Sequence, residues 1–166
     1  INMILLDWEK AFDKVSQESI FETLERLGVA KTLINLTREL YKNPTFRIEL
    51  DGQESEWKKQ STGIRQGCTL SPYLFVIVMT AIFHDVKSNT ELNKKLIGHR
   101  APNTTIDEVL YADDTIIFST ENMTIEKLLN KIEDCAEPYG LRLNQDKCES
   151  ICTDTVHHKN TKTKKG

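Results

Sequence analysis

The decisive stretch of this sequence is Leu110-Tyr111-Ala112-Asp113-Asp114-Thr115-Ile116-Ile117-Phe118. Two adjacent aspartates stand between apolar, β-prone segments, a pattern that predicts a strand–turn–strand over residues 107–119. The two carboxylates would lie at its tip, where they cannot both be buried and ionised without a counter-ion. Divalent cations such as Mg²⁺ prefer carboxylate oxygens, so the pair indicates a metal site.

A second acidic position lies far upstream, in Ile4-Leu5-Leu6-Asp7. The apolar residues before Asp7 predict a buried strand over residues 2–6. One carboxylate after one strand and a pair in a hairpin make the ligand set of a two-metal phosphoryl-transfer site. We therefore expect Asp7, Asp113 and Asp114 to converge on one surface cleft.

Length and composition are those of one globular domain with a hydrophobic core, since the chain has 166 residues. No apolar run reaches the ~18 residues of a membrane span, and no signal peptide is visible. We therefore expect an intracellular protein, nuclear or cytoplasmic, that is not secreted and binds no membrane. The chain starts without Met inside a strand pattern, so we expect it to be a piece of something longer.

The cysteines and histidines near the end of the chain invite a zinc-finger interpretation. Cys148 and Cys152 precede His157 and His158, but only residues 153–156 separate the two pairs. That gap is shorter than the ~12 residues usual in a finger. Free thiols in a reducing compartment are the better interpretation.

Four helices are predicted from apolar periodicity and capping residues. Ser16 suits the N-cap of a helix through Leu27, which Gly28 ends, and a second helix covers about residues 30–42. Ser71-Pro72 opens a central core helix to about Lys87, and the fourth helix covers about 124–137. The expected core residues of the first two are Ile20, Phe21, Leu24, Leu27, Leu33, Ile34, Leu36, Leu40 and Tyr41.

The remaining segments predict short strands and loops. Residues 46–50 alternate as a half-buried strand, Asp51-Gly52 is a hairpin turn, and a return strand lies near residues 55–60. We interpret residues 88–105 as a loop, residues 141–143 and 149–152 as a final strand pair, and His84 as a core histidine. The order predicts an α+β domain with a small antiparallel sheet backed by helices.

Read together, these segments resemble the palm motifs of reverse transcriptases, most closely those of non-LTR (LINE-type) retrotransposons. The motifs are Asp7-Trp8-Glu9-Lys10-Ala11-Phe12, Arg65-Gln66-Gly67-Cys68-Thr69-Leu70-Ser71-Pro72, Tyr111-Ala112-Asp113-Asp114, and Gly140-Leu141-Arg142-Leu143-Asn144 with Lys147. The resemblance covers about residues 2–152. It implies a right-hand polymerase palm over residues 1–153, with fingers and thumb largely absent. The basic tail over 154–166 has no apolar cluster, so we expect it to be disordered.

The resemblance implies an RNA-directed DNA polymerase that extends a primer 3′-hydroxyl with a dNTP by two-metal nucleotidyl transfer. Two Mg²⁺ ions, with Mn²⁺ as a possible substitute, would be held by Asp7 and Asp113. Asp114 and the backbone carbonyl of Trp8 would support them. Lys147 would act as general acid toward pyrophosphate.

Further positions acquire substrate-binding roles from the same resemblance. The N–H of Ala11 would touch phosphate, and Phe12 would exclude a 2′-hydroxyl from beneath the sugar. Gln66 and Gly67 would pack on the incoming nucleotide and the template, and Tyr111 would lie under the primer end. The implied partners are an RNA template, a DNA primer, dNTP, and the fingers and thumb of a larger polyprotein.

The net charge of −3 is unusual for an isolated nucleic-acid binder, which is typically basic. It fits a palm fragment whose phosphate-neutralising residues lie in the absent parts, and such a fragment would be inactive alone. A non-catalytic retrotransposon-derived remnant or binding module is an open alternative, although intact Asp7, Asp113 and Asp114 argue against long decay. The other alternative is an RNA-dependent RNA polymerase, against which the bulky Phe12 argues.

Overall fold

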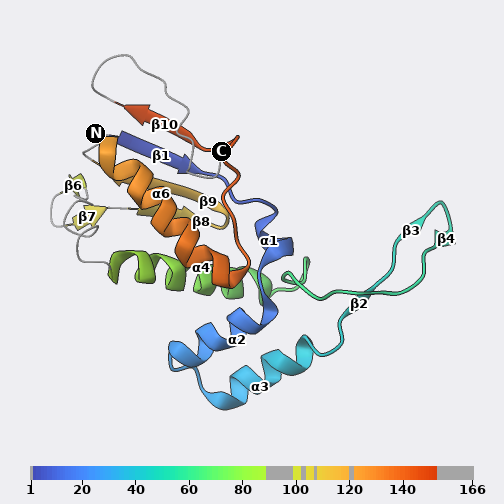
Figure 1. The fold of residues 1–166 in the computed structure, drawn as a ribbon. Helices are drawn as coiled ribbons and strands as arrows, with labels where there is room; N and C mark the ends of the chain where they lie inside the picture. The colour runs from blue at the N-terminus through green and yellow to red at the C-terminus, as the bar shows by residue number, and fades with distance from the viewer. Residues whose placement is uncertain (1, 89–98, 102–103, 107, 120–121, 153–166) are drawn as a thin grey trace.

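A four-stranded antiparallel sheet forms the centre of this computed structural model, which describes residues 2–88, 99–101, 104–106, 108–119 and 122–152. The strand order is β10-β1-β9-β8, so the first strand of the chain lies between strands from its last third (Figure 1). The bounds are β1 Asn2–Leu6, β8 Glu108–Tyr111, β9 Asp114–Ser119 and β10 Glu149–Cys152. Leu5 pairs with Ile116 on one side and with Glu149 on the other. The predicted α+β class, strand 2–6 and strand–turn–strand are confirmed.

Two helices supply most of the core against this sheet. They are α4 (Ser71–Ser88) and α6 (Asn122–Ala136), which pack against each other beside the strands (Figure 1). Ile4, Phe75, Ile82, Leu128 and Ile132 are fully buried within one continuous cluster. Burial of each such side chain contributes about 1.5–3 kcal/mol, so α4 is the central core helix that its apolar sequence predicts.

The helix α2 (Gln17–Arg26) begins as predicted, because the Ser16 hydroxyl accepts a hydrogen bond from the Ser19 N–H. It ends before Gly28, whose φ of +74° suits a helix C-terminus. The next helix, α3 (Lys31–Leu40), packs on α2 through Ile34, Thr37 and Tyr41. The prediction that Leu27, Leu33, Leu36 and Leu40 join the core is wrong, because each is about half exposed or more. The three leucines of α3 lie on a different face from its buried residues.

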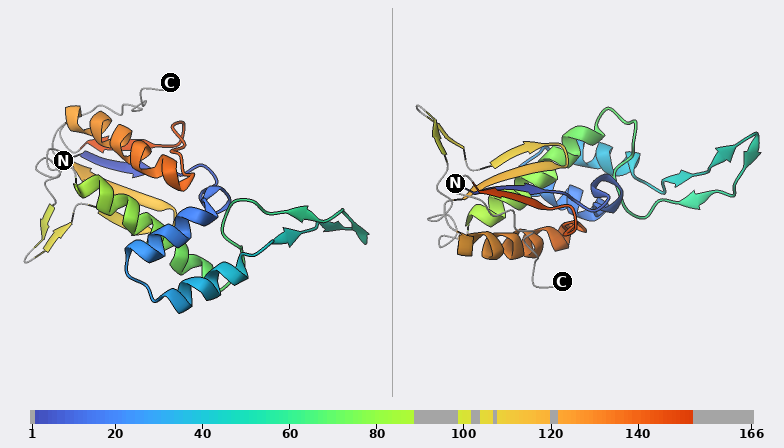
Figure 2. Two further views of the ribbon diagram at one scale, coloured as in Figure 1. Left: turned by 60° about the horizontal axis from the view of Figure 1, so that its bottom comes forward. Right: turned by 90° about the horizontal axis from the view of Figure 1, so that it is seen from above.

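A long hairpin projects from the body of the molecule, and we call residues 45–60 the hairpin arm (Figures 1 and 2). Its strands are β2 (Thr45–Phe46), β3 (Glu49–Leu50), β4 (Gln53–Glu54) and β5 (Lys58–Lys59), paired as β2–β5 and β3–β4. The turn at Asp51-Gly52 is confirmed, with φ of +52° and +74°. The half-buried strand over 46–50 is wrong: it is broken in the middle and exposed throughout.

The C-terminal third departs from the predicted strand pair. β10 pairs with β1, whereas residues 141–143 make only an isolated bridge between Leu143 and Trp8. β10 pairs with the edge of β1 that lies opposite β9. Directly before residues 141–143, Gly140 (φ +78°) ends the short helix η1 (Glu137–Tyr139), near the predicted helix end.

Two smaller expectations also change. His84 is not a core histidine, because its side chain is 73% exposed on the outer face of α4. The expected loop over 88–105 contains a hairpin of β6 (His99–Ala101) and β7 (Thr104–Ile106), and its other residues after Ser88 lie outside the described residues. A short helix, α1 (Ala11–Lys14), is present but was not predicted. The expectation for the tail over 154–166 also falls outside the described residues. None of the helices in the described ranges is long and apolar enough to cross a membrane.

Candidate active site

The acidic positions lie next to the same end of the β1–β9 pairing. The last β1–β9 pair is Leu6 with Thr115, and Asp7 and Asp114 are the residues next to this pair on the two strands. Asp114 pairs with Tyr111, and the turn between them is Ala112-Asp113. Ala112 has a φ of +52°, a left-handed conformation that costs a non-glycine residue about 1 kcal/mol. The sequence therefore accepts backbone strain to present Asp113 at the tip.

These carboxylates have the donor chemistry of a hard-cation site but are not drawn together as a closed cage. Asp113 and Asp114 are exposed, and Asp7 is half-buried. Within the part of the chain that the structure describes, no three His, Cys, Asp or Glu side chains are grouped as they would be around a metal ion. The predicted convergence of three carboxylates on one cleft therefore stays a prediction, supported by the strand register.

The backbone around Asp7 is anchored on both sides. Its carbonyl accepts a hydrogen bond from the Asn144 N–H at 2.8 Å, and Glu9 N–H donates to the Arg142 carbonyl at 3.0 Å. On the other side, the Trp8 indole N–H donates to the Thr115 hydroxyl at 3.2 Å. This last contact joins two buried side chains 107 positions apart, and sequence inspection did not reveal it.

Lys147 lies on the same turn as Asn144. Its N–H donates to the Asn144 carbonyl at 3.1 Å, and its side chain is exposed. The next residue, Cys148, is buried beside Asp7. Burial raises the pKa of the Cys148 thiol, and the negative charge of Asp7 raises it further, so this thiol stays neutral at pH 7.

The predicted nucleotide-binding residues share a hollow of about 430 Å³ near the N-terminus of α4. Phe12, Gln66 and Gly67 line it together with Cys68, Thr69, Ser71 and Pro72. The Phe12 ring is half-buried and stacks on the fully buried Phe75 ring, with centroids 4.3 Å apart and planes inclined by 19°. The hollow therefore has one rigid aromatic wall.

Hydrogen bonds tie the loop over residues 62–68 to α1. Ile64 N–H donates to the Phe12 carbonyl and Gly63 N–H to the Val15 carbonyl, each at 2.7 Å. The Gln66 side chain donates to Asp13 at 3.0 Å. Because α1 begins only four residues after Asp7, this network links the hollow to the acidic end of the sheet.

Gly63 makes the closest approach in this loop. A Cβ there would lie 2.7 Å from the Asp13 carbonyl oxygen, and the φ of +83° also favours glycine. Gly67, which the sequence singled out for close approach, has open space around its Cα. The sequence offered a signal for Gly63 only through its place in the Thr62-Gly63-Ile64 loop.

The other predicted substrate-binding residues do not line this hollow. Ala11 is buried at the start of α1, and Tyr111 is 80% exposed beside the acidic turn. The Cys68 thiol in the hollow has a lowered pKa because of a backbone hydrogen bond at Leu70, with a further contribution from the Ser71 side chain. In the sequence, Cys68 stands out only as one residue of the loop motif.

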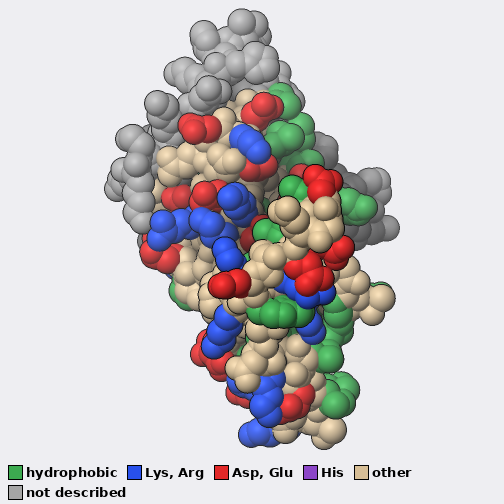
Figure 3. Space-filling model, turned by 90° about the vertical axis from the view of Figure 1, so that its right-hand side faces the viewer, with side chains coloured by type: hydrophobic (Ala, Val, Ile, Leu, Met, Phe, Trp, Pro, Cys, Tyr) green, Lys and Arg blue, Asp and Glu red, His purple; other side chains and the backbone are tan. Residues whose placement is uncertain are grey.

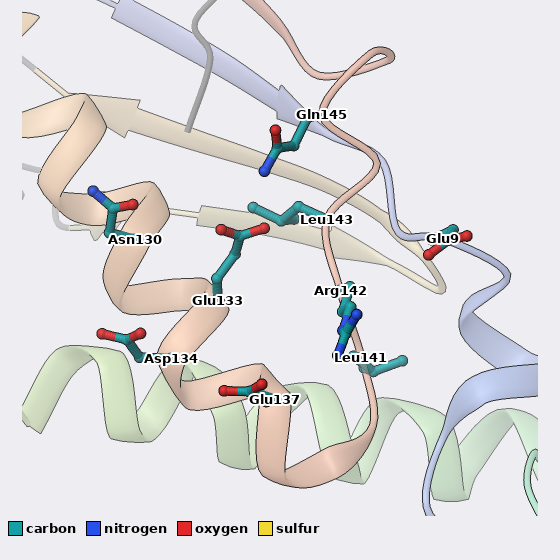
Figure 4. Close-up of a pocket in the computed structure, with 9 residues that line it drawn as sticks. All are labelled: Glu9, Asn130, Glu133, Asp134, Glu137, Leu141, Arg142, Leu143 and Gln145. Atoms are coloured by element: carbon teal, nitrogen blue, oxygen red, sulfur yellow. The ribbon is translucent and has the colours of Figure 1, made fainter. Parts of the chain in front are cut away.

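A second hollow, of about 580 Å³, lies between α6 and residues 141–145. Glu9, Glu133, Asp134 and Glu137 give it an acidic lining beside Arg142, and Glu133 points across it toward Leu143 and Gln145 (Figure 4). None of the predicted site residues lines it, so we keep it separate from the candidate active site.

The side of the molecule that carries the hairpin arm shows basic and acidic side chains interspersed (Figure 3).

Comparisons with known proteins give consistent matches. The family model for reverse transcriptase (RNA-dependent DNA polymerase) matches residues 2–164. The retrovirus-related Pol polyprotein of the type-2 retrotransposable element R2DM from Drosophila melanogaster is 33% identical over 146 residues, which are 88% of this chain and 13% of the polyprotein. The RNA-directed DNA polymerase from mobile element jockey of the same species is 25% identical over 88% of this chain and 15% of its own length.

A solved structure of telomerase from Candida albicans, in complex with a fragment of telomeric RNA, has the same fold as this chain. The TM-score is 0.66 over 94% of this chain and 27% of that chain, at 17% sequence identity. The chain thus spans about an eighth to a seventh of the length of these two relatives and about a quarter of this solved structure.

Proposed function

Since the chain belongs to the reverse transcriptase family, we propose that it forms the catalytic palm of an RNA-directed DNA polymerase from a non-LTR retrotransposon. The observation that carries the proposal is the strand register at the acidic end of the sheet. Leu6 pairs with Thr115 and Tyr111 with Asp114, so Asp7 and the Asp113-Asp114 turn belong to adjacent strands. Carboxylates from separate strands are what two-metal nucleotidyl transfer requires.

In the proposed reaction, the 3′-hydroxyl of a DNA primer attacks the α-phosphate of a dNTP, and pyrophosphate leaves in line. Asp7 and Asp113 would hold two Mg²⁺ ions, or Mn²⁺ in their place, with Asp114 and the Trp8 carbonyl in support. Such ions, when bound, lower the pKa of the attacking hydroxyl and stabilise the leaving pyrophosphate. The exposure of Asp113 and Asp114 leaves their oxygens free to turn toward a ligand.

The hollow beside α4 would receive the incoming nucleotide. The Phe12 ring, backed by Phe75, would lie beneath the sugar and clash with a 2′-hydroxyl, which favours dNTP over rNTP. Gln66 and Gly67 would pack on the base pair that forms with the RNA template, and the Ala11 N–H would contact phosphate. Tyr111 is solvent-accessible, as a residue under the primer end must be.

We assign Lys147 the proton transfer to the leaving pyrophosphate. Its turn is joined to Asp7 through the Asn144 N–H, so its flexible ammonium starts near the acidic end of the sheet. A lysine needs only modest pKa lowering to act as a general acid at neutral pH.

The nucleic-acid partners would be held largely by other parts of the polyprotein. The chain has a net charge of −3, and its arm-bearing side mixes both signs of charge (Figure 3). Phosphate binding depends on clustered lysine and arginine. We therefore propose that fingers and thumb segments, outside this chain, grip the RNA template and DNA primer, and that the whole acts inside the cell.

The test is primer extension on an RNA template by the full-length polyprotein that contains this chain, with Mg²⁺ and dNTPs. Asp113→Asn should lower kcat by about a thousandfold or more, because it removes a proposed metal ligand. Asp51→Asn is the matched control: it makes the same chemical change at the arm turn, where Asn tolerates the positive φ, and activity should not change. A folded polyprotein that extends no primer would favour the non-catalytic remnant instead.

A further inference from the structure

We propose that the hydrogen bond between the Trp8 indole and the Thr115 hydroxyl positions the three aspartates, which makes Trp8 and Thr115 positioning residues of the active site. This inference rests on the proposed function. Trp8 follows Asp7 directly, and Thr115 follows Asp114 directly. The bond therefore joins the two acid-bearing segments one residue from their carboxylates, at 3.2 Å.

The backbone alone does not hold this junction. Regular β1–β9 pairing ends at Leu6 and Thr115. Beyond that point the chain from β1 pairs with a different segment, since the Asp7 carbonyl accepts from Asn144 and Trp8 bridges Leu143. The side chain of Trp8 reaches back to β9. It is thus the polar link that ties the Asp7–Trp8 segment to the strand that presents Asp113 and Asp114.

The chemistry of the pair makes the link directional and hard to replace. An indole nitrogen can only donate, so the Thr115 oxygen must accept. Trp8 is 4% exposed and Thr115 is 1% exposed, so water has little access to either group. Removal of the hydroxyl would leave a buried N–H without a partner and free the indole to shift, carrying Asp7 with it.

The chain offers its own spectroscopic probe for this arrangement. Tb³⁺ is a hard cation that binds carboxylates, and its luminescence is sensitised by a nearby tryptophan. The sequence has two tryptophans, and Trp57 lies on the exposed hairpin arm. Trp57→Phe would therefore leave Trp8 as the only tryptophan donor beside the aspartates, and this variant is the parent for the titrations.

The experiment is a Tb³⁺ titration of the 166-residue parent and of three variants made in it. Thr115→Val keeps the shape and removes the hydroxyl, and should weaken Tb³⁺ binding on the order of fivefold. Thr115→Ser keeps the hydroxyl and should restore binding to within about twofold of the parent. Equal affinity of Thr115→Val and the parent would overturn the proposal.

Asp113→Asn separates this proposal from the proposed function. It should weaken Tb³⁺ binding by more than about tenfold, because it removes a ligand. If Asp113→Asn weakens binding and Thr115→Val does not, only the positioning role fails. If Asp113→Asn binds as the parent does, the metal site itself is wrong and both proposals fail.

A second measurement distinguishes a positioning role of Trp8 and Thr115 from a purely structural one. Calorimetric titration with Mn²⁺ needs no tryptophan, so Trp8→Phe, Thr115→Val and their double variant can be compared as folded proteins. If the hydrogen bond positions the ligands, the double variant should bind Mn²⁺ no more weakly than either single variant. Additive losses, or variants that are less stable in urea but unchanged in Mn²⁺ affinity, would contradict the positioning role.

Discussion

The central sheet and the hairpin arm are both built from segments rich in apolar, β-prone residues, yet they reach opposite degrees of burial. In the sheet, Ile4, Leu6 and Ile117 are almost completely buried under α4 and α6. In the arm, Phe46, Ile48, Leu50 and Trp57 remain 44–71% exposed, and each strand is two residues long. Arg47 pairs with Glu54 and lies over the Trp57 ring, so local contacts replace a core. An apolar, β-prone segment thus yields a longer strand only where a second layer covers one face.

The largest expected effect is a difference between core and arm variants in the free energy of unfolding. Phe75→Ala removes a fully buried ring from the core and should lower the free energy of unfolding by about 3–5 kcal/mol. Trp57→Ala removes an aromatic ring of the arm and should change it by less than about 1 kcal/mol. Urea denaturation of both variants measures the difference. Similar losses would mean that the arm belongs to the cooperative core.

A smaller effect is expected where the arm returns to the palm. Gly63→Ala sets a Cβ 2.7 Å from the Asp13 carbonyl and forces a left-handed alanine, so it should cost about 2–3 kcal/mol. Gly67→Ala has nearly the same φ, +81°, but open space, and should cost only about 1 kcal/mol. Thermal unfolding of the pair isolates the close approach from the backbone strain. An equal cost for both would show that loop 62–68 can move away from α1.

Phe12, at the edge of the core, should control the selection of dNTP over rNTP. In the full polyprotein, Phe12→Val shortens the ring that stacks on Phe75 and opens space beneath the nucleotide sugar. The ratio of kcat/KM for dNTP over rNTP should fall by about tenfold or more, or ~1.4 kcal/mol, while dNTP use is largely kept. An unchanged ratio would make Phe12 a core residue only.

The smallest effect concerns a surface ion pair between α2 and α4. The Arg26 guanidinium hydrogen-bonds Asp85 and holds the pKa of that carboxyl below its ordinary value of 3.8. A depressed pKa contributes stability that is present above pH 3.8 and is lost as the pH falls through the lower, folded-state pKa. Asp85→Asn should therefore cost about 0.5–1 kcal/mol at pH 7, and less than that once the wild-type carboxyl is protonated. Urea titrations at pH 7 and pH 3 test this. A cost that does not shrink at pH 3 would point to lost packing.

Much of the fold could be predicted because local signals and burial agreed there. The strand before Asp7, the cap at Ser16 and the apolar helix after Pro72 each have a signal within a few residues. The failures lie where a distant partner decides. Leu36 has a helical pattern but no covering layer, and residues 141–143 lost their predicted partner because β10 joined β1.

The candidate site likewise has features that the sequence predicted and features that it did not. Residue types and spacing singled out the aspartates, and the family resemblance singled out Phe12 and the Gln66-Gly67 loop, whereas the roles of all these residues stay predictions. The Trp8–Thr115 contact and the closeness of Gly63 to Asp13 depend on three-dimensional approach across the chain, for which one sequence carries no local sign. The turn at Ala112 was recognisable, but its positive φ was not, because alanine is an unusual choice there.

The place of β1 in the sheet has a consequence for the order in which the protein can assemble. Both neighbours of β1 come from the last third of the chain, so neither edge of β1 can be paired before a ribosome has delivered β9, the earlier of the two. Until then, an apolar strand with two open edges is exposed to other chains. Such long-range pairing is slow. A nascent chain that stops before β9 has Asp7 but no partner strand for it, so the acidic end of the sheet arises only after β9 has been made.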